Sequence, residues 1–448
     1  MSLLLGCTGG DLGGSGATES ESSTGSAGGG SSTGGESSTG DVCEPVADGF
    51  CRAAPIAMDE LLAGVGGFPI DAGYGDVTAI GDINGDGLAD LQIDAFVVFS
   101  QPGTVALSDD PELLAPRGFQ VLAPSGALRL SGVGDVNGDG RGDLLGTDHD
   151  EGVSWIVFGK EDTNDVDTAE VSAGVGGFEI TSAVFDAALR PLGDVDGDGL
   201  GDLALTSGER IRIIPGKADG APIDVALTEA VAEFKGADLE PASAVAAGDL
   251  DGDGVAEVVY AIAYGEVVVL SAPKGWAAPE RVETVIDALF DDDLVIRDLD
   301  GDGVDDLAVM YFLTTVFGAT VGVVLYGPLE LGGPPLGDPN LWNVASEAGV
   351  PVFIAADDVP GAEVVATEVD MEDAGPVRYV PQVLRLASFV PPQPASSCPY
   401  PRGVLFEDQR ASFANVGDVD GDGSEDLLLR ARAGDDDVLV AVVTSVCD

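Results

Sequence analysis

The chain is poor in basic residues and in histidine. Its 448 residues include 19 lysines and arginines against 79 acids, and His149 is the single histidine. The resulting negative field repels phosphate backbones and anionic lipid headgroups, so nucleic-acid binding is disfavoured. A nucleophilic triad needs a histidine base. Because His149 lies between two aspartates, we expect a solvated surface side chain and no enzyme of this class.

Cysteine is also scarce. The five cysteines are Cys7, Cys43, Cys51, Cys398 and Cys447, and none stands in a CxxC pair. Without such pairs and with one histidine, a zinc site is not expected. Separated cysteines are typical of exported proteins. With Cys7 set aside, the other four allow three disulfide pairings, among which the sequence does not choose.

The chain lacks a run of 18 apolar residues that could cross a membrane. Residues 1–7 end in Leu-Leu-Gly-Cys, which resembles the lipobox of bacterial lipoproteins, in which the cysteine becomes the lipidated N-terminus. No basic segment or long apolar segment precedes Cys7, so the interpretations are a truncated signal or a chance match. Residues 8–42 are nearly all Gly, Ser and Thr, which predicts a disordered linker. It is either a tether to a lipid anchor or a tail without an anchor.

What the chain does contain is one acidic motif in six copies. The first, DINGDGLADL, begins at Asp82, and the others begin at Asp135, Asp194, Asp249, Asp298 and Asp418. Oxygen-bearing side chains fall at positions 1, 3, 5 and 9, and glycines that permit a tight turn fall at positions 4 and 6. Calcium takes about six to eight oxygen ligands from such groups. We predict about six calcium ions in six loops, numbered loop 1 to loop 6 in chain order.

The predicted ligands are the side chains at positions 1, 3, 5 and 9 and the carbonyl at position 7. They are Asp82, Asn84, Asp86, Leu88 and Asp90 in loop 1; Asp135, Asn137, Asp139, Arg141 and Asp143 in loop 2; Asp194, Asp196, Asp198, Leu200 and Asp202 in loop 3; Asp249, Asp251, Asp253, Val255 and Glu257 in loop 4; Asp298, Asp300, Asp302, Val304 and Asp306 in loop 5; and Asp418, Asp420, Asp422, Ser424 and Asp426 in loop 6. Loops 3, 5 and 6 should bind more tightly than loops 1 and 2, in which asparagine replaces one carboxylate. The alternative, acidic turns without metal, would leave the carboxylates repelling one another.

The spacing of the loops predicts a repeat architecture. Successive loops start 53, 59, 55 and 49 residues apart, and the last interval is 120. Residues 358–365 align with loop 4 after a three-residue deletion and lack the ligands, so they indicate a seventh unit. Short β-branched runs bounded by Gly, Asp and Pro flank the loops and predict strands, and we find no helical periodicity around them. An EF-hand is excluded because position 12 lacks its glutamate.

These observations predict an all-β fold, a seven-bladed β-propeller of four-stranded blades with calcium loops in six blades. It should span residues 60–448, after a cysteine-bracketed lead-in at residues 43–59. The last unit has room for only three strands. The string at residues 64–70, GVGGFPI, recurs within the body at residues 174–180 as GVGGFEI. We therefore expect residues 64–70 to complete the last blade and to join the two ends of the chain.

Tyr74-Gly75 followed by loop 1 resembles the FG-GAP repeat of the integrin α-subunit N-terminal β-propeller and of bacterial VCBS-type proteins. The resemblance covers about residues 60–448. It implies that each loop joins the first two strands of a blade and binds calcium on one face. The Gly-Ala-Pro portion of the repeat is mostly absent, and Phe-Gly is degenerate outside Tyr74-Gly75, which leaves the packing between blades open. Loops in six of seven units make the chain more similar to the bacterial relatives.

The function expected from these features is a non-catalytic binding or adhesion module, tethered to a bacterial cell surface as an outer-membrane lipoprotein or released outside the cell. A protein or glycan ligand, a monomer, and no membrane contact beyond the anchor are expected. The alternatives are a secreted propeller enzyme that acts on polysaccharide and a purely structural envelope protein. The tripeptide Arg141-Gly142-Asp143 matches an integrin-binding signal, but Asp143 is a predicted metal ligand. Residues 370–403 are the least repeat-like and form either a ligand-contacting loop or an ordinary outer hairpin.

Overall fold

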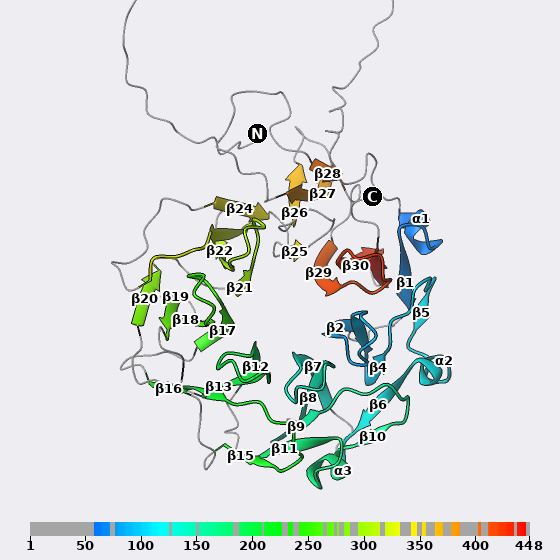
Figure 1. Ribbon diagram of the computed structural model, residues 1–448. Coiled ribbons are helices and arrows are strands. Elements are labelled where there is room, and N and C mark those ends of the chain that lie inside the picture. Colours follow the sequence, from blue (N-terminus) through cyan, green and yellow to red (C-terminus); the bar gives the residue numbers. More distant parts are fainter. Residues whose placement is uncertain are drawn as a thin grey trace, which may run out of the picture.

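The chain folds as an all-β propeller, as the sequence predicts. The computed structural model describes residues 58–71, 77–124, 128–148, 152–181, 188–207, 210–225, 232–235, 242–262, 267–272, 276, 282–286, 294–313, 319–331, 342–346, 352–354, 363–370, 378–385, 402–404, 411–433 and 437–444. Their strands hydrogen-bond into seven sheets, which surround a central opening (Figure 1). Among the described residues, no helix is long and apolar enough to cross a membrane.

Each sheet has its first strand at the central opening (Figure 1) and adds three more strands outward by antiparallel pairing. Sheet 1 holds β2 (Val77–Gly81), β3 (Asp90–Ile93), β4 (Phe96–Val98) and β6 (Gly118–Leu122), and sheet 2 holds β7 (Leu128–Gly134), β8 (Asp143–Asp148), β9 (Val153–Val157) and β11 (Gly177–Thr181). Sheet 3 holds β12 (Ala188–Gly193), β13 (Asp202–Ser207), β14 (Arg210–Ile214) and β16 (Ala232–Lys235), and sheet 4 holds β17 (Ala242–Gly248), β18 (Glu257–Ile262), β19 (Val267–Ser271) and β20 (Val282–Ile286).

The remaining sheets follow the same order. Sheet 5 holds β21 (Leu294–Arg297), β22 (Asp306–Leu313), β23 (Ala319–Leu325) and β24 (Trp342–Ser346), and sheet 6 holds β25 (Val352–Ile354), β26 (Glu363–Asp370), β27 (Arg378–Arg385) and β28 (Arg402–Val404). Sheet 7 holds β29 (Ala411–Gly417), β30 (Asp426–Ala433), β31 (Asp437–Val443) and β1 (Gly67–Asp71). Six of these sheets are regular blades that carry the acidic loop between their first two strands, and sheet 6 is a divergent one without it.

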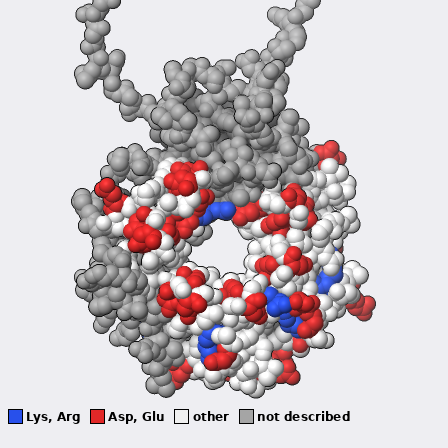
Figure 2. All heavy atoms as spheres, viewed as in Figure 1, with Lys and Arg blue, Asp and Glu red and all other residues white. Residues whose placement is uncertain are grey.

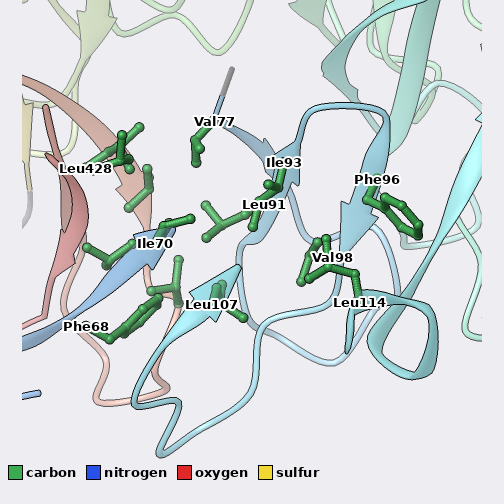
Figure 3. Close-up of a cluster of buried hydrophobic side chains, with 14 residues drawn as sticks. Phe68, Ile70, Val77, Leu91, Ile93, Phe96, Val98, Leu107, Leu114 and Leu428 are labelled. Atoms are coloured by element: carbon green, nitrogen blue, oxygen red, sulfur yellow. The ribbon is translucent and has the colours of Figure 1, made fainter. Parts of the chain in front are cut away.

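The two ends of the described chain meet in sheet 7. Strand β1 pairs antiparallel with β31, with Gly67 opposite Val443 and Ile70 opposite Val440, which is the pairing expected for the segment around residues 64–70. The side chains of Phe68 and Ile70 are 3% and 4% exposed, and they pack with Leu91, Val98 and Leu428 between sheets 7 and 1 (Figure 3). Burying each of these side chains contributes about 2 kcal/mol, so this interface holds the ring closed.

The expectation of four strands per blade is wrong for three sheets. A two-residue strand from the following unit adds to the outer edge of each, in parallel: β5 (Leu107–Ser108) on β1, β10 (Val166–Asp167) on β6, and β15 (Ile223–Asp224) on β11. Segments this short have no hydrophobic periodicity of their own. They become strands only because they hydrogen-bond to the outer strand of the neighbouring sheet.

Helices are present where the sequence indicated none. They are α1 (Met58–Leu62), α2 (Pro111–Leu114) with the 3-10 turn η1 (Ala115–Arg117), and α3 (Thr168–Ser172). The side chains of Asp110 and Asp167 accept the backbone N–H groups of Glu112 and Ala169 and so cap α2 and α3. Helices of four or five residues are too short to show a 3.6-residue period, which explains why periodicity missed them.

Several expectations fall outside the described residues. These are the lipobox and linker at residues 1–42, the lead-in at residues 43–57, Tyr74-Gly75, His149 and residues 358–362. All five cysteines also fall there, so the disulfide pairings stay as predictions.

Candidate metal-binding loops

The six acidic loops occupy equivalent places in the six regular blades. In each, the inner strand ends at the residue directly before position 1, and position 9 is the first residue of the second strand, as with Asp90 in β3 and Asp143 in β8. This is the placement that the family resemblance implied. Acidic side chains gather in patches around the mouth of the central opening (Figure 2).

The carboxylate at position 1 organises the turn. In loop 1, Asp82 accepts hydrogen bonds from the N–H groups of Gly85, Asp86 and Gly87 at 2.7, 3.1 and 2.8 Å. The same three bonds are made by Asp135, Asp194, Asp249 and Asp298 in loops 2 to 5. Gly85 and Gly87 have φ of 78° and 91°, a region that favours glycine. The spacing of aspartate and glycine is thus what this backbone requires.

The acid at position 9 is buried in every loop. Asp90, Asp143, Asp202, Asp306 and Asp426 are 0% exposed, and Glu257 is 1% exposed. One carboxylate oxygen of each accepts the N–H of the residue at position 2, at 2.8 to 3.0 Å. The buried acid therefore joins the start of the loop to the start of the second strand.

Burial raises the pKa of each of these acids, since the charged form loses its hydration. The pKa is raised to about 6 for Asp202 and Asp306, to about 7 for Asp90 and Asp143, and to about 8 for Glu257 and Asp426. Repulsion from the other acids of the same loop adds to the effect, although the backbone hydrogen bonds oppose it. A nearby cation would restore the charged form.

The second oxygen of the buried acid distinguishes loop 6. In sheets 1, 2, 3 and 5 this oxygen accepts an N–H from the residues that follow the third strand, Ser100, Gly159, Gly216 and Gly327, at 2.7 to 2.9 Å. In loop 6 the buried Oδ1 of Asp426 has no hydrogen-bond partner among the described residues. A buried carboxylate oxygen without a donor is costly, and a cation in the loop would satisfy it.

Four loops bring three carboxylates together. The groups are Asp194, Asp196 and Asp202 in loop 3; Asp249, Asp251 and Glu257 in loop 4; Asp298, Asp300 and Asp302 in loop 5; and Asp418, Asp420 and Asp426 in loop 6, and in each the candidate ligand atoms lie within 4.8 Å of one another. The pKa of the position 3 acid is raised in all four by burial and then by repulsion from the acid at position 5. These clusters could hold a metal ion, and their hard oxygen donors suit calcium or magnesium.

Loops 1 and 2 differ, as the sequence predicted, because position 3 is asparagine. The side-chain amide of Asn84 donates to Asp86 at 3.0 Å, and that of Asn137 donates to Asp139 at 3.2 Å. Each amide therefore offsets part of the carboxylate repulsion that the other loops retain. Weaker cation binding by loops 1 and 2 stays a prediction.

The tripeptide at residues 141–143 does not present its aspartate. The side chain of Asp143 is fully buried and accepts N–H groups from Val136 and Gly159. The guanidinium of Arg141 instead reaches loop 1, where its Nε donates to the carbonyl of Asn84 at 3.3 Å, and it forms an ion pair with Glu161. The side chains of Arg141 and Asp143 therefore both make contacts within the protein.

Position 8 has a role that sequence reasoning missed. In loops 1, 2, 3 and 5 its backbone N–H bonds to the loop of the preceding blade, as with Gly142 and the carbonyl of Asp82 at 2.6 Å. The available signal was the small residue at this position in three of the four loops that make the bond, Ala89, Gly142 and Gly201, although Ala256 is equally small and makes no such bond among the described residues. An added Cβ at Gly142 would lie 3.1 Å from the carbonyl oxygen of Asp82, so a small side chain permits this close approach.

One comparison with known protein families agrees with the repeat found in the sequence. Residues 194–260, which contain loops 3 and 4, match the family model of the FG-GAP-like repeat. A search of the curated proteins finds no match.

Two solved structures are similar at low identity. One is an Agrocybe aegerita lectin described in terms of its specific recognition of non-reducing terminal N-acetylglucosamine, with 16% identity, a TM-score of 0.40, and coverage of 68% of this chain and 80% of that one. The other is AofleA from Arthrobotrys oligospora, with 9% identity, a TM-score of 0.31, and coverage of 88% of this chain and 94% of that one.

Proposed function

Because the chain carries FG-GAP-like repeats in a β-propeller, we propose that it is a calcium-stabilised, non-catalytic binding module that acts outside the cell. The observation that carries the proposal is the set of acidic loops around one end of the central opening (Figure 2), each with a buried acid that forms no ion pair with a lysine or arginine among the described residues. Bound calcium would supply that missing positive charge. The propeller would then be a rigid ring that displays a surface for a ligand.

Calcium is favoured over magnesium because of how many oxygens each loop offers. Four side chains and one carbonyl give at least five protein oxygens, and calcium accepts such crowded, flexible ligand sets. Magnesium prefers near-octahedral sites in which it keeps several waters. We expect about six calcium ions per chain, bound most tightly by loops 3 to 6.

Titration of the full chain with calcium, followed by calorimetry, tests the metal part of the proposal. Binding of several ions per chain is expected, with much weaker binding of magnesium. Chelator should lower the melting temperature by many degrees, because binding energy becomes folding energy when the unfolded chain has no site. An unchanged melting curve in chelator would refute a structural role for calcium.

The binding role needs a separate test, since calcium alone does not define a ligand. The calcium-loaded chain would be applied to arrays of glycans and of extracellular proteins, with the chelator-treated chain as the control. Calcium-dependent retention of one ligand class supports the proposal. Turnover of a polysaccharide by the same preparation would favour the enzyme alternative. The 0–1% exposure of the acids at position 9 supports the non-catalytic proposal.

The proposed cell-surface tether rests on the sequence of residues 1–42. In this hypothesis Cys7 is lipidated and residues 8–42 span the distance to the propeller. Expression of the full-length gene in a Gram-negative host should place the chain in the membrane fraction, and Cys7→Ser should release it. Equal distribution of both forms in the soluble fraction would overturn the anchor.

A further inference from the structure

The acidic loops contact one another around the ring through one repeated hydrogen bond. The N–H at position 8 of a loop donates to the carbonyl at position 1 of the loop before it. The four bonds are Ala89 to Asp418 at 2.7 Å, Gly142 to Asp82 at 2.6 Å, Gly201 to Asp135 at 2.7 Å and Asp305 to Asp249 at 3.0 Å. Each bond therefore joins residues of two different metal-binding loops.

A single peptide group connects the two loops in each case. The carbonyl of this peptide group belongs to position 7 and is a predicted ligand of its own loop. The N–H belongs to position 8 and donates to the residue at position 1 of the preceding loop, whose side chain is the first predicted ligand there. A cation at the carbonyl polarises the peptide and strengthens its N–H as a donor. Binding in one loop should therefore favour the binding-competent form of the loop before it.

A side-chain contact accompanies each of these bonds. The position 7 side chain lies against the position 4 glycine of the preceding loop, so that a Cβ added to the glycine would lie 2.6 to 3.3 Å from it. The pairs are Leu88 on Gly421, Arg141 on Gly85, Leu200 on Gly138 and Val304 on Gly252. The same four pairs of loops are thus in contact through two independent features.

The contact is absent at one junction between consecutive loops. Among the described residues, no backbone bond joins Ala256 of loop 4 to Asp194 of loop 3. A Cβ added to Gly197, the position 4 glycine of loop 3, would have no neighbour within 4 Å. Trp276 instead donates its indole N–H to the carbonyl of Ala256 at 2.9 Å. A second interruption lies at sheet 6, which has no acidic loop.

We propose that calcium binds the loops as two coupled groups, loops 6, 1, 2 and 3 in one group and loops 4 and 5 in the other. This inference rests on the calcium binding proposed above. The junction between loops 4 and 5 has an additional bond, because the N–H of Asp249 donates to the Oδ2 of Asp305 at 3.0 Å. Asp305 thus bonds to both the carbonyl and the N–H of Asp249, the first residue of loop 4, and it is not itself a predicted ligand.

Loop 4 offers a matched test, because loops 3 and 5 flank it and only loop 5 is bonded to it. Two variants remove equal charge: Asp194→Asn with Asp196→Asn in loop 3, and Asp298→Asn with Asp300→Asn in loop 5. Any general electrostatic effect of a neighbouring loop should appear in both variants. Hydrogen-exchange mass spectrometry at a series of calcium concentrations would report the protection of residues 249–258 separately from that of the other loops.

The loop 5 variant should raise the calcium concentration needed to protect loop 4 about fivefold or more, a typical size for coupling between sites. The loop 3 variant should leave it unchanged. Equal shifts in both variants, or no shift in either, would overturn the coupling while leaving calcium binding intact. Absence of calcium-dependent protection in the unmodified chain would instead refute the proposed metal binding itself.

Single substitutions at Asp305 provide a check in which all ligands are kept. Asp305→Ala removes the acceptor for the N–H of Asp249, and it should weaken the effect of loop 5 on loop 4. Asp305→Asn keeps an acceptor oxygen while removing the charge, and it should retain the effect. Loss of the effect in both variants would show that the charge of Asp305 contributes to the coupling and its hydrogen bond does not. An unchanged effect in both variants would overturn the role proposed for this side chain and leave the backbone bond to the test above.

Discussion

Arg297 and Glu425 form an ion pair with two hydrogen bonds, Nη1 to Oε2 at 2.9 Å and Nη2 to Oε1 at 3.2 Å. Arg297 ends β21 directly before loop 5, and Glu425 is position 8 of loop 6. In loops 1, 2, 3 and 5 the position 8 N–H contacts the preceding acidic loop, but sheet 6, which precedes loop 6, has no such loop. The Glu425 side chain, which also accepts from Asn415 at 2.7 Å, links sheet 7 to sheet 5 instead.

A double-mutant cycle with Arg297→Met and Glu425→Gln should give a coupling free energy of about 1 kcal/mol, at the upper end for a partly exposed pair. The physical reason is the two-bonded geometry of a planar guanidinium on a carboxylate. Chemical denaturation in calcium measures the cycle. Arg129→Met, a substitution of an exposed arginine on β7, serves as the control for loss of charge. Additive effects of the two substitutions would contradict the pairing.

Metal-free protein should lose stability as pH rises. The folded state keeps protons on Asp143 and Asp426 up to pH values of about 7 and about 8, whereas an unfolded aspartate releases its proton near pH 4. Between these values the folded state binds more protons than the unfolded state, so the free energy of unfolding falls with increasing pH. Denaturation in chelator from pH 5 to pH 8 measures this slope.

Calcium should reverse that dependence, since a bound cation stabilises the ionised carboxylates. The melting temperature in excess calcium is expected to be level or to rise over the same range. Parallel curves with and without calcium would show that the buried acids at position 9 do not sense the metal.

The fourth strand of sheet 2, β11, begins with a glycine whose replacement should be costly. Gly177 has φ of 149°, and an added Cβ would lie 2.0 Å from the carbonyl oxygen of Ile156. Gly177→Ala should cost roughly 3 kcal/mol or more, because the backbone of β9 would have to move. The adjacent Gly176, with φ of 70° and no atom near the added Cβ, is the matched control. Its alanine variant should cost about 1 kcal/mol from left-handed strain alone. Thermal denaturation compares the two.

Trp276 should report on loop 4. Its indole is 2% exposed and donates to the carbonyl of Ala256, so a change in loop 4 alters its surroundings. We expect calcium to change the tryptophan emission of the chain, and Trp276→Phe to remove most of that change. Trp155, whose indole N–H donates to Ser172 in α3 at 2.9 Å, provides the control, because Trp155→Phe should leave the response in place.

The motif alone predicted much of this arrangement. Aspartate and glycine at fixed positions predicted where each turn lies. Few backbone conformations both let the Asp82 carboxylate accept the N–H groups of the turn and give Gly87 a positive φ. The repeated string around Phe68 and Phe178 predicted which segment completes the last sheet. These features follow from local geometry and from one comparison within the chain.

Features that depend on a neighbouring blade could not be predicted. Asp90 is buried because of the residues that pack around it. The motif shows only that position 9 has a side chain with oxygen atoms. The bond from Gly142 to Asp82 and the pairing of Arg297 with Glu425 join residues 60 and 128 positions apart. The small residue at position 8 marks only one side of the first contact, and no local pattern marks the second, since each partner is chosen by the order of sheets around the ring.

The short strands β5, β10 and β15 lie in one unit of the chain and complete the sheet of the unit before it. The units of sequence and the units of structure are therefore out of phase in this half of the ring. Deleting or transplanting one unit, cut at the ends of its own four strands, would strip an edge strand from its neighbour and expose the freed edge to aggregation. Recombination that preserves folding would need to exchange two consecutive units, or to carry the two-residue strand along with its host.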